Sequence, residues 1–156
     1  MKKILGVFAI IIATTMTMQA QSISKNALGL RFGDNDGFGG EVSYQRHLKE
    51  NNRLEFDFGW RNSNDVDAFK LVGLYQWVMP IDGGFNWFVG AGGGVGSYDT
   101  DGDNGTFALV AGDIGIEYNF EIPLVVSLDA RPELGFNDSY SDDLDFDIAL
   151  GIRYQF

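Results

Sequence analysis

The stretch LDFDIALGIRYQF, residues 144–156, alternates between two kinds of side chain over its whole length. Every other residue from Leu144 to Phe156 is apolar or aromatic, and the residues between them are charged, polar or small. A helix cannot place a period of two on one face, whereas a strand can. Soluble strands usually run about 5–6 residues, but a strand that crosses a membrane needs about 9–11, with apolar side chains toward lipid. We therefore expect this stretch to be the closing strand of a transmembrane barrel.

Seven further stretches alternate in the same way, and turn-forming residues separate them. The expected strands are 26–33, 38–48, 53–61, 68–79, 85–98, 106–120 and 124–136. In 68–79 both faces hold apolar residues, so the lipid-facing side stays open there. Pro132 cannot donate a ladder hydrogen bond, so we expect a bulge or local break beside it. The prediction is an all-β fold, an eight-stranded antiparallel up-and-down transmembrane β-barrel, because an even number of hairpin-linked strands suits a closed bacterial barrel.

The first twenty residues have the pattern of a secretory signal peptide. Lys2 and Lys3 precede an apolar run, and Ala20 precedes the expected cleavage before Gln21. We predict a signal peptide at 1–20 and an outer-membrane β-barrel at 21–156, and we expect no peptidoglycan-binding domain after Phe156. The chain has no Cys, which excludes disulfides and lipid attachment through cysteine.

The composition is acidic and rich in glycine and aromatic residues. The formal net charge is −11, and removing the signal peptide with its two lysines makes it −13. This charge argues against nucleic-acid binding, which uses basic patches. The 21 glycines and the 14% of aromatic residues fit a sheet-rich chain with tight turns and outward-facing rings.

The connections are expected to alternate between the two sides of the membrane. The periplasmic turns would be 49–52, 80–84 and 121–123, and the outer loops 34–37, 62–67, 99–105 and 137–143. Three of these outer loops are longer than the turns, as is typical of outer-membrane barrels. Aromatic residues near the strand ends would form the two interface girdles.

The signal peptide, the eight alternating strands and a last strand that reads Gly151-x-x-Tyr154-x-Phe156 resemble the small OmpA/OmpX-like outer-membrane barrel family. The terminal aromatic pattern is similar to the tag that the barrel-assembly machinery reads, although Ala149 stands where a polar residue is usual. The resemblance implies a porin-like barrel in the outer membrane of a Gram-negative cell. Its members include structural, adhesive, weakly pore-forming and enzymatic proteins, so it leaves the function open.

A set of charged residues is expected to point into the barrel. An eight-stranded barrel has an interior just wide enough for side chains to fill it, so these charges must pair or meet water. We expect a network of ion pairs and water that plugs the barrel, and a narrow cation path is the alternative. Inward-facing glycines at 90, 92, 94 and 96 would leave room for long Arg and Lys side chains, or mark curvature. The inward set is Arg31, Glu41, Arg53, Glu55, Asp57, Arg61, Lys70, Asp113, Glu117, Asp129, Arg131, Glu133, Asp145, Asp147 and Arg153.

The expected outer loops are acidic and contain no Lys or Arg. Residues 99–103 have the oxygen spacing of a calcium loop, but Asn104 and Val110 stand where the EF-hand needs Gly and Glu. A solvated acidic rim is therefore favoured, and loose divalent binding that bridges to lipopolysaccharide is the alternative. The loop aspartates are Asp34, Asp36, Asp65, Asp67, Asp99, Asp101, Asp103, Asp138, Asp142 and Asp143.

The residues that could carry catalysis are few. The only histidine, His47, falls beside a periplasmic turn and is expected to be a polar rim residue. The glycine run at 89–96 does not fit the nucleotide-binding G-x-G-x-x-G pattern. A nucleophilic hydrolase is disfavoured without Cys or a well-placed His. We therefore expect no catalytic, cofactor-binding or metal-binding residues and no cofactor.

The sequence favours a non-enzymatic outer-membrane barrel with a structural or surface-interaction role and acidic extracellular loops. A small cation-preferring pore is the first alternative. A soluble lipocalin-like barrel is the second, with its apolar residues turned inward around an apolar ligand. The expected partners are outer-membrane lipid, lipopolysaccharide and, during biogenesis, the barrel-assembly machinery; nucleic acid is excluded and an extracellular partner is undefined.

Overall fold

The computed structural model describes residues 24–33, 39–63, 66–100, 103–136 and 144–156, which form eight strands. None of these residues forms a helix with the length and hydropathy needed to cross a membrane. The predicted signal peptide and the connections at 34–37 and 137–143 lie outside the described residues. The strands are β1 (Asn26–Gly33), β2 (Gly40–Lys49), β3 (Asn52–Ser63), β4 (Val66–Asp82), β5 (Phe85–Thr100), β6 (Asp103–Asn119), β7 (Leu124–Gly135) and β8 (Leu144–Gln155).

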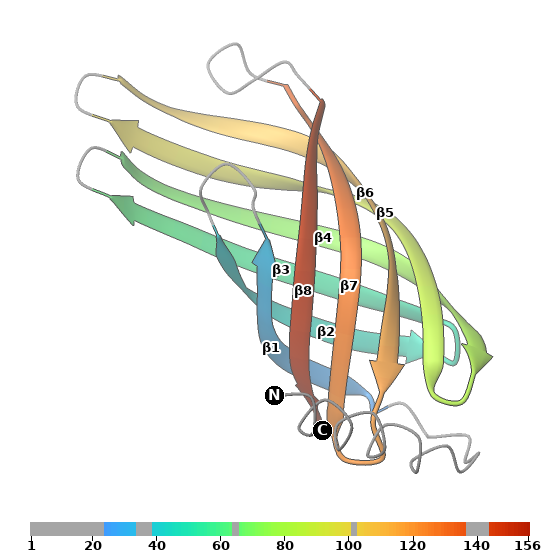
Figure 1. The fold of residues 1–156 in the computed structure, drawn as a ribbon. Coiled ribbons are helices and arrows are strands. Elements are labelled where there is room, and N and C mark those ends of the chain that lie inside the picture. Colours follow the sequence, from blue (N-terminus) through green and yellow to red (C-terminus); the bar gives the residue numbers. More distant parts are fainter. Residues whose placement is uncertain (1–23, 34–38, 64–65, 101–102, 137–143) are drawn as a thin grey trace, which may run out of the picture.

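The strands form one closed antiparallel barrel in chain order, which confirms the predicted fold class. The closing pair joins β1 to β8, with Leu30 opposite Ile152. Asn26 and Phe156 exchange backbone hydrogen bonds of 3.1 and 2.9 Å. The start of β1 and the end of β8 therefore lie side by side at one rim of the barrel, here called the terminal end (Figure 1). The opposite end is called the far end.

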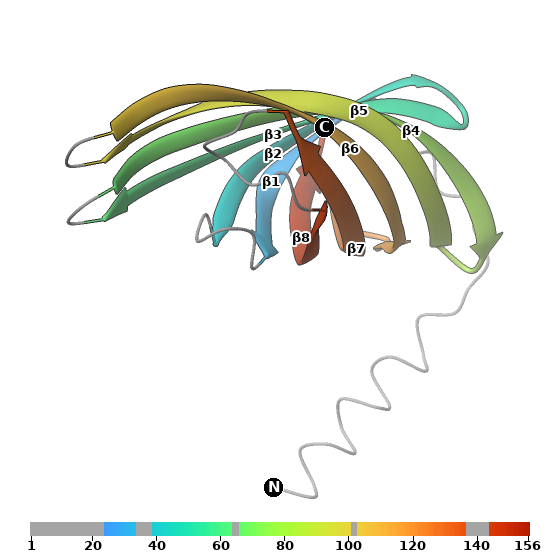
Figure 2. The ribbon, with the colours of Figure 1, turned by 90° about the horizontal axis from the view of Figure 1, so that it is seen from above.

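The β3–β4 and β5–β6 hairpins extend beyond the other strands at the far end (Figures 1 and 2). Their registers reach Ser63 opposite Val66 and Thr100 opposite Asp103. The prediction of loops over 62–67 and 99–105 is therefore wrong, because the strands extend into both ranges. The expectation that these two connections are longer than the turns at the terminal end is also wrong. Their Asp, Asn and Gly residues favour turns locally, but a ladder bonds through the backbone and can continue through such residues.

The two faces of the wall follow the predicted alternation. Exposed apolar and aromatic residues cover the outside, and Ile148, Leu150 and Ile152 of β8 are 65%, 44% and 42% exposed. In β4, where the orientation was open, Val72, Leu74 and Val78 face the lumen and are at most 2% exposed. The soluble barrel with an apolar-lined interior is therefore wrong, because its faces would be inverted.

The ladder between β6 and β7 has a local gap beside Pro132, as expected. The register runs from Leu109 opposite Gly135 to Ala111 opposite Glu133, and resumes at Ile114 opposite Ala130. The register is the same on both sides of the gap, so the irregularity is a break and not a bulge. Proline has no backbone N–H to donate to the neighbouring strand.

Candidate functional site

The lumen is filled with charged side chains from seven of the eight strands. Thirteen of the fifteen residues predicted to point inward are buried; Arg61 and Asp145 are only partly buried, because they lie near the far ends of β3 and β8. The buried set consists of five cations and eight carboxylates. Charges in such a place need close partners, because an unpaired buried charge is costly.

Arg131 is the centre of the far-end half of this network. Its guanidinium lies 2.8 Å from Glu41, 2.9 Å from Asp57 and 2.7 Å from Glu133. A fourth carboxylate, Asp147, lies 3.4 Å away. One side chain of β7 thus joins carboxylates from β2, β3, β7 and β8 across the lumen.

Two other cations complete this half. Arg31 pairs with Glu41 at 2.9 Å and also with Asp129 and Asp147. Lys70 reaches Glu133 at 3.0 Å. The carboxylates are shared between cations, because Arg31 and Arg131 both contact Glu41 and Asp147. The result is a continuous cross-link between opposite walls, as the predicted plug requires.

A second group of charges lies nearer the terminal end. Arg153 contacts Glu55 at 2.7 Å and the hydroxyl groups of Ser43 and Ser127 at 2.8 Å each. Arg53 contacts Glu117 at 2.5 Å and lies over the ring of Phe88, with 4.8 Å between guanidinium carbon and ring centroid. Arg153 and Arg53 are thus surrounded partly by hydroxyl groups and an aromatic ring, whereas Arg131 is surrounded by carboxylates.

Asp113 differs from the other buried carboxylates. Among the described residues it is the one buried carboxylate with no cation within ion-pair distance, and the side-chain amide of Gln76 donates a hydrogen bond to its Oδ2. Gln76 in turn accepts a hydrogen bond of 2.5 Å from Arg53 through its Oε1. Asp113 is therefore connected to Arg53 only through the side-chain amide of Gln76.

The side of the lumen lined by β4, β5 and β6 is apolar toward the far end. Val72, Leu74, Phe107, Leu109 and Ala111 form a buried cluster there, against which Tyr98 packs. A Cβ atom at Gly96 would overlap the ring of Phe107. The prediction that the β5 glycines make room for Arg and Lys is therefore wrong at this position, where the space is taken by an aromatic ring.

His47 lies at the terminal end, as expected, but it is buried and not a rim residue. It is 9% exposed and stands opposite Arg53 in the β2–β3 register. Its backbone N–H donates a 2.8 Å hydrogen bond to Lys25, which extends the pairing of β1 over this position. The histidine is nonetheless distant from the far end.

The far-end hairpins form a surface that we call the projecting sheet, residues 60–63, 66–69, 97–100 and 103–106. Within it Asp67 lies opposite Asp99, and both are exposed. Asn62 and Asn104 continue the same row on the neighbouring strands. No group of three or more His, Cys, Asp or Glu among the described residues is arranged to hold a metal ion. Asp101 of the calcium-like stretch lies outside those residues.

Comparison with known proteins identifies the fold. No family model matches the chain, and no curated protein is similar to it in sequence. The N-terminal β-barrel domain of Pseudomonas aeruginosa OprF is 13% identical, with a TM-score of 0.68 over 86% of this chain and 100% of that one. Neisserial surface protein A is 10% identical, with a TM-score of 0.68 over 87% and 100%. Ail of Yersinia pestis, in complex with the heparin analogue sucrose octasulfate, is 15% identical, with a TM-score of 0.55 over 85% and 97%.

These structures share an architecture with this chain at very low sequence identity. The chain thus has the fold of small eight-stranded outer-membrane barrels, which confirms the expected resemblance at the level of fold. Fold similarity leaves the activity open.

Proposed function

We propose that the chain is a non-enzymatic integral protein of the Gram-negative outer membrane, with a barrel closed to passage and a projecting sheet that acts at the cell surface. The filled lumen is the observation that carries this proposal. Arg31, Arg131 and Lys70 cross the interior and each contacts carboxylates of other strands. The apolar outer face supports the membrane location, and the fold similarity to OprF and Ail is consistent with it.

The proposed absence of enzyme activity rests on how the polar groups are used. The buried carboxylates at the centre of the lumen form ion pairs with Arg31 and Arg131. These pairs occupy the carboxylate oxygens that a substrate would need to contact. His47 stands at the terminal end, far from the surface that the projecting sheet would present outside. A general base must lie within hydrogen-bond reach of its substrate. An extracellular molecule at the projecting sheet would not be within that distance of His47.

The surface role would involve partners with positive charge. Asp67 and Asp99 lie side by side on the projecting sheet, and the sequence places further aspartates in the connections. A sulfated ligand such as that of Ail would be repelled by this charge, so the partner class differs from that protein's. Lipopolysaccharide would be contacted through bridging divalent cations. The exposed rings of Tyr154 and Phe156 would be read by the barrel-assembly machinery.

Conductance across a planar bilayer tests the closed lumen. Folding is first verified on a gel from the change in mobility on heating. A silent bilayer with folded protein is the expected result, because ion pairs cross the lumen of a barrel whose interior is just wide enough for side chains to fill it. Stable cation-selective steps would instead establish the alternative, a small cation-preferring pore whose inward carboxylates select the ion.

The surface role is tested with a variant that lacks the projecting sheet. Residues 61–68 and 98–105 are each replaced by Asn-Gly, which closes a two-residue hairpin between opposed residues. Trp60 then connects to Phe69, and Ser97 to Thr106, which are cross-strand partners already. Proteoliposomes of neutral lipid with the intact protein should bind a polylysine surface and not a heparin surface, with binding that weakens in salt. Equal binding by the shortened protein, verified as folded, would contradict the proposal.

A further inference from the structure

Arg46 of β2 faces outward from the barrel, among residues that would contact lipid. It alternates with the buried residues Gln45 and His47, so its side chain lies on the outer face. Among the described residues between the terminal turns and the projecting sheet, it is the one charged residue on that face. A cation that faces hydrocarbon is unfavourable, and near the interface it is stabilised by water or an anion. The position of Arg46 therefore points to a ligand.

Apolar and aromatic side chains surround Arg46 on the wall of the barrel. Along β2, Tyr44 precedes it by two residues and Leu48, which is 49% exposed, follows it by two residues. Across the ladder, Arg46 lies opposite Leu54 of β3. Because two residues of a strand span about 6.6 Å, Arg46 lies in the wall and not on the terminal turn. A lipid headgroup beside the wall reaches this depth, whereas a soluble partner at the rim would contact Leu48 first.

Two neutral groups hold the guanidinium of Arg46 in place. Its Nη1 donates a 2.9 Å hydrogen bond to Oδ1 of Asn26, which lies opposite it on β1. The hydroxyl group of Tyr44 donates a second 2.9 Å hydrogen bond to the same oxygen. The four buried arginines of the lumen all contact carboxylates, but no described carboxylate lies within ion-pair distance of Arg46. Its charge is uncompensated, and its other N–H groups can donate to an anion.

The surroundings of Arg46 at the terminal end carry a positive excess. Lys25 and Lys49 are exposed there, and the carbonyl of Lys25 accepts a hydrogen bond from the residue that follows Arg46. Glu50, in the turn after β2, is the carboxylate nearest to them along the chain. A headgroup with a net negative charge is attracted to this combination of three cations and one carboxylate, whereas an ammonium group is repelled by it.

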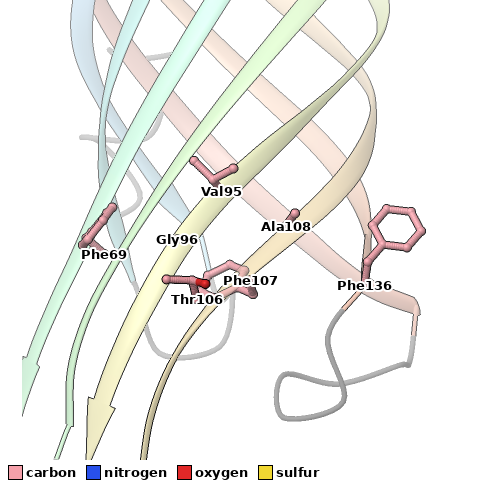
Figure 3. A pocket seen from close by; sticks show the side chains of 7 residues that line it. All are labelled: Phe69, Val95, Gly96, Thr106, Phe107, Ala108 and Phe136. Atoms are coloured by element: carbon pink, nitrogen blue, oxygen red, sulfur yellow. The ribbon is translucent and has the colours of Figure 1, made fainter.

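The outer face near the far end has the opposite character. An apolar groove there is lined by Phe69, Val95 and Phe136 among other residues, and none of its lining side chains is charged (Figure 3). Two residues beyond Phe69 on β4 lies Asp67, with Asp99 opposite it, and both are exposed. An anionic headgroup would therefore meet a cation on the wall at the terminal end and carboxylates at the far end.

We propose that Arg46 binds the phosphate group of an anionic phospholipid in the leaflet at the terminal end. This inference rests on the proposed function, which places that end on the periplasmic side, where the leaflet consists of phospholipid. A guanidinium fork matches the paired oxygens of a phosphate. The next two rows toward the far end place Leu28 opposite Tyr44 and Leu30 opposite Val42. Headgroup, interface and hydrocarbon would contact these three rows in that order.

The test is native mass spectrometry of the folded protein after exchange with a defined lipid. Phosphatidylglycerol and phosphatidylethanolamine with identical acyl chains are the two probes, each added separately. The wild type should retain one phosphatidylglycerol and retain phosphatidylethanolamine more weakly. Arg46→Gln removes the charge and keeps a donor for Asn26. It should weaken retention of phosphatidylglycerol about tenfold, as expected for one lost charge-assisted hydrogen bond, and abolish the preference between the two lipids.

Two further variants separate the bound phosphate from general attraction to a basic rim. Arg46→Lys keeps the charge without the fork, should weaken retention less, and replaces Arg46→Gln if that variant fails to fold. Lys49→Gln removes the same charge from the end of the same strand and should change retention less than about twofold, because solvent screens an exposed charge.

Three outcomes would overturn the proposal. They are equal retention of the two lipids by the wild type, equal retention of phosphatidylglycerol by the wild type and the Arg46 variant, and equal losses for the Arg46 and Lys49 variants. The last result would assign the attraction to the rim as a whole. Failure of the wild type to insert into bilayers would instead refute the membrane location in the proposed function.

Discussion

The two sides of the lumen are stabilised in different ways. Toward the far end, β7, β8, β1, β2 and β3 fill the interior with ion pairs centred on Arg31 and Arg131, which Lys70 of β4 joins. The remaining inward residues of β4 and β6 there fill it with an apolar cluster against glycine-rich β5. On the charged side each group depends on particular partners, because an orphaned buried charge is expensive. On the apolar side the requirement is shape, since dispersion contacts are weak individually and depend on close fit. The comparison predicts that substitutions will be most costly where one group serves several partners.

Arg131→Ala should have the largest effect. It leaves Asp57 without its cation and removes one cation each from Glu41, Glu133 and Asp147. We expect a loss of about 3–5 kcal/mol in the free energy of unfolding, typical of a broken buried pair. Urea titration of the protein in lipid vesicles, followed by tryptophan fluorescence, measures it. A loss below 1 kcal/mol would mean that water already solvates these carboxylates.

Leu109→Ala probes the apolar side. Leu109 is 5% exposed within the cluster of Val72, Leu74 and Phe107. We expect a loss of about 3 kcal/mol, because a truncated core side chain loses its transfer free energy and leaves a cavity. The same titration measures it, with Val110→Ala on the outward-facing side as the control. A smaller loss for Leu109→Ala than for the control would show that the apolar side is loosely packed.

Much of this arrangement could be predicted from the sequence. The alternation in β8 and in 53–61 identified the faces, because a period of two assigns every second side chain to the same side. The inward charges followed from this. The orientation of 68–79 could not be settled locally, since Val72, Leu74 and Val78 are as apolar as their outward neighbours. Their burial depends on Lys70 and Gln76, which share their face and have partners on distant strands.

The ends of the long hairpins were missed for a related reason. Asn, Asp and Gly between 99 and 105 indicate a loop by composition. The backbone ladder nonetheless continues through residues 99–100 and 103–105, where Asp99 lies opposite Asn104 and Thr100 opposite Asp103. Only the register reveals such pairing.

Gly96→Val tests the fit of the apolar side by adding volume. A side chain at this position would overlap the ring of Phe107 and the backbone of Phe69. We expect a loss of about 1–3 kcal/mol, as for other overpacked cores. Combining it with Phe107→Ala should recover part of this loss if the ring is the obstacle. Additive losses in the double variant would assign the clash to the backbone.

Asp113→Asn should have the smallest effect on the free energy of unfolding. Asp147→Asn is the matched substitution at a carboxylate that is paired with cations. Asp113 has an amide donor as its partner, and an asparagine carbonyl can accept the same bond from Gln76, so we expect a change below about 1 kcal/mol. Asp147 accepts from two arginines, and removing its charge should cost about 1.5–3 kcal/mol. Equal losses for both variants would show that charge pairing does not distinguish the two positions.

The ladder gap beside Pro132 has a consequence for the order in which the barrel opens. A ring of strands can separate only by losing one of its ladders, and the ladder between β6 and β7 is already interrupted at Gly112–Pro132 and Asp113–Arg131. Arg131 binds carboxylates of β2, β3 and β8 in the lumen, so its strand stays attached to that side when the seam widens. The amide proton of Gly112, which faces Pro132 across the gap, should exchange with solvent sooner than those of β8, because local opening starts where the fewest backbone bonds must break.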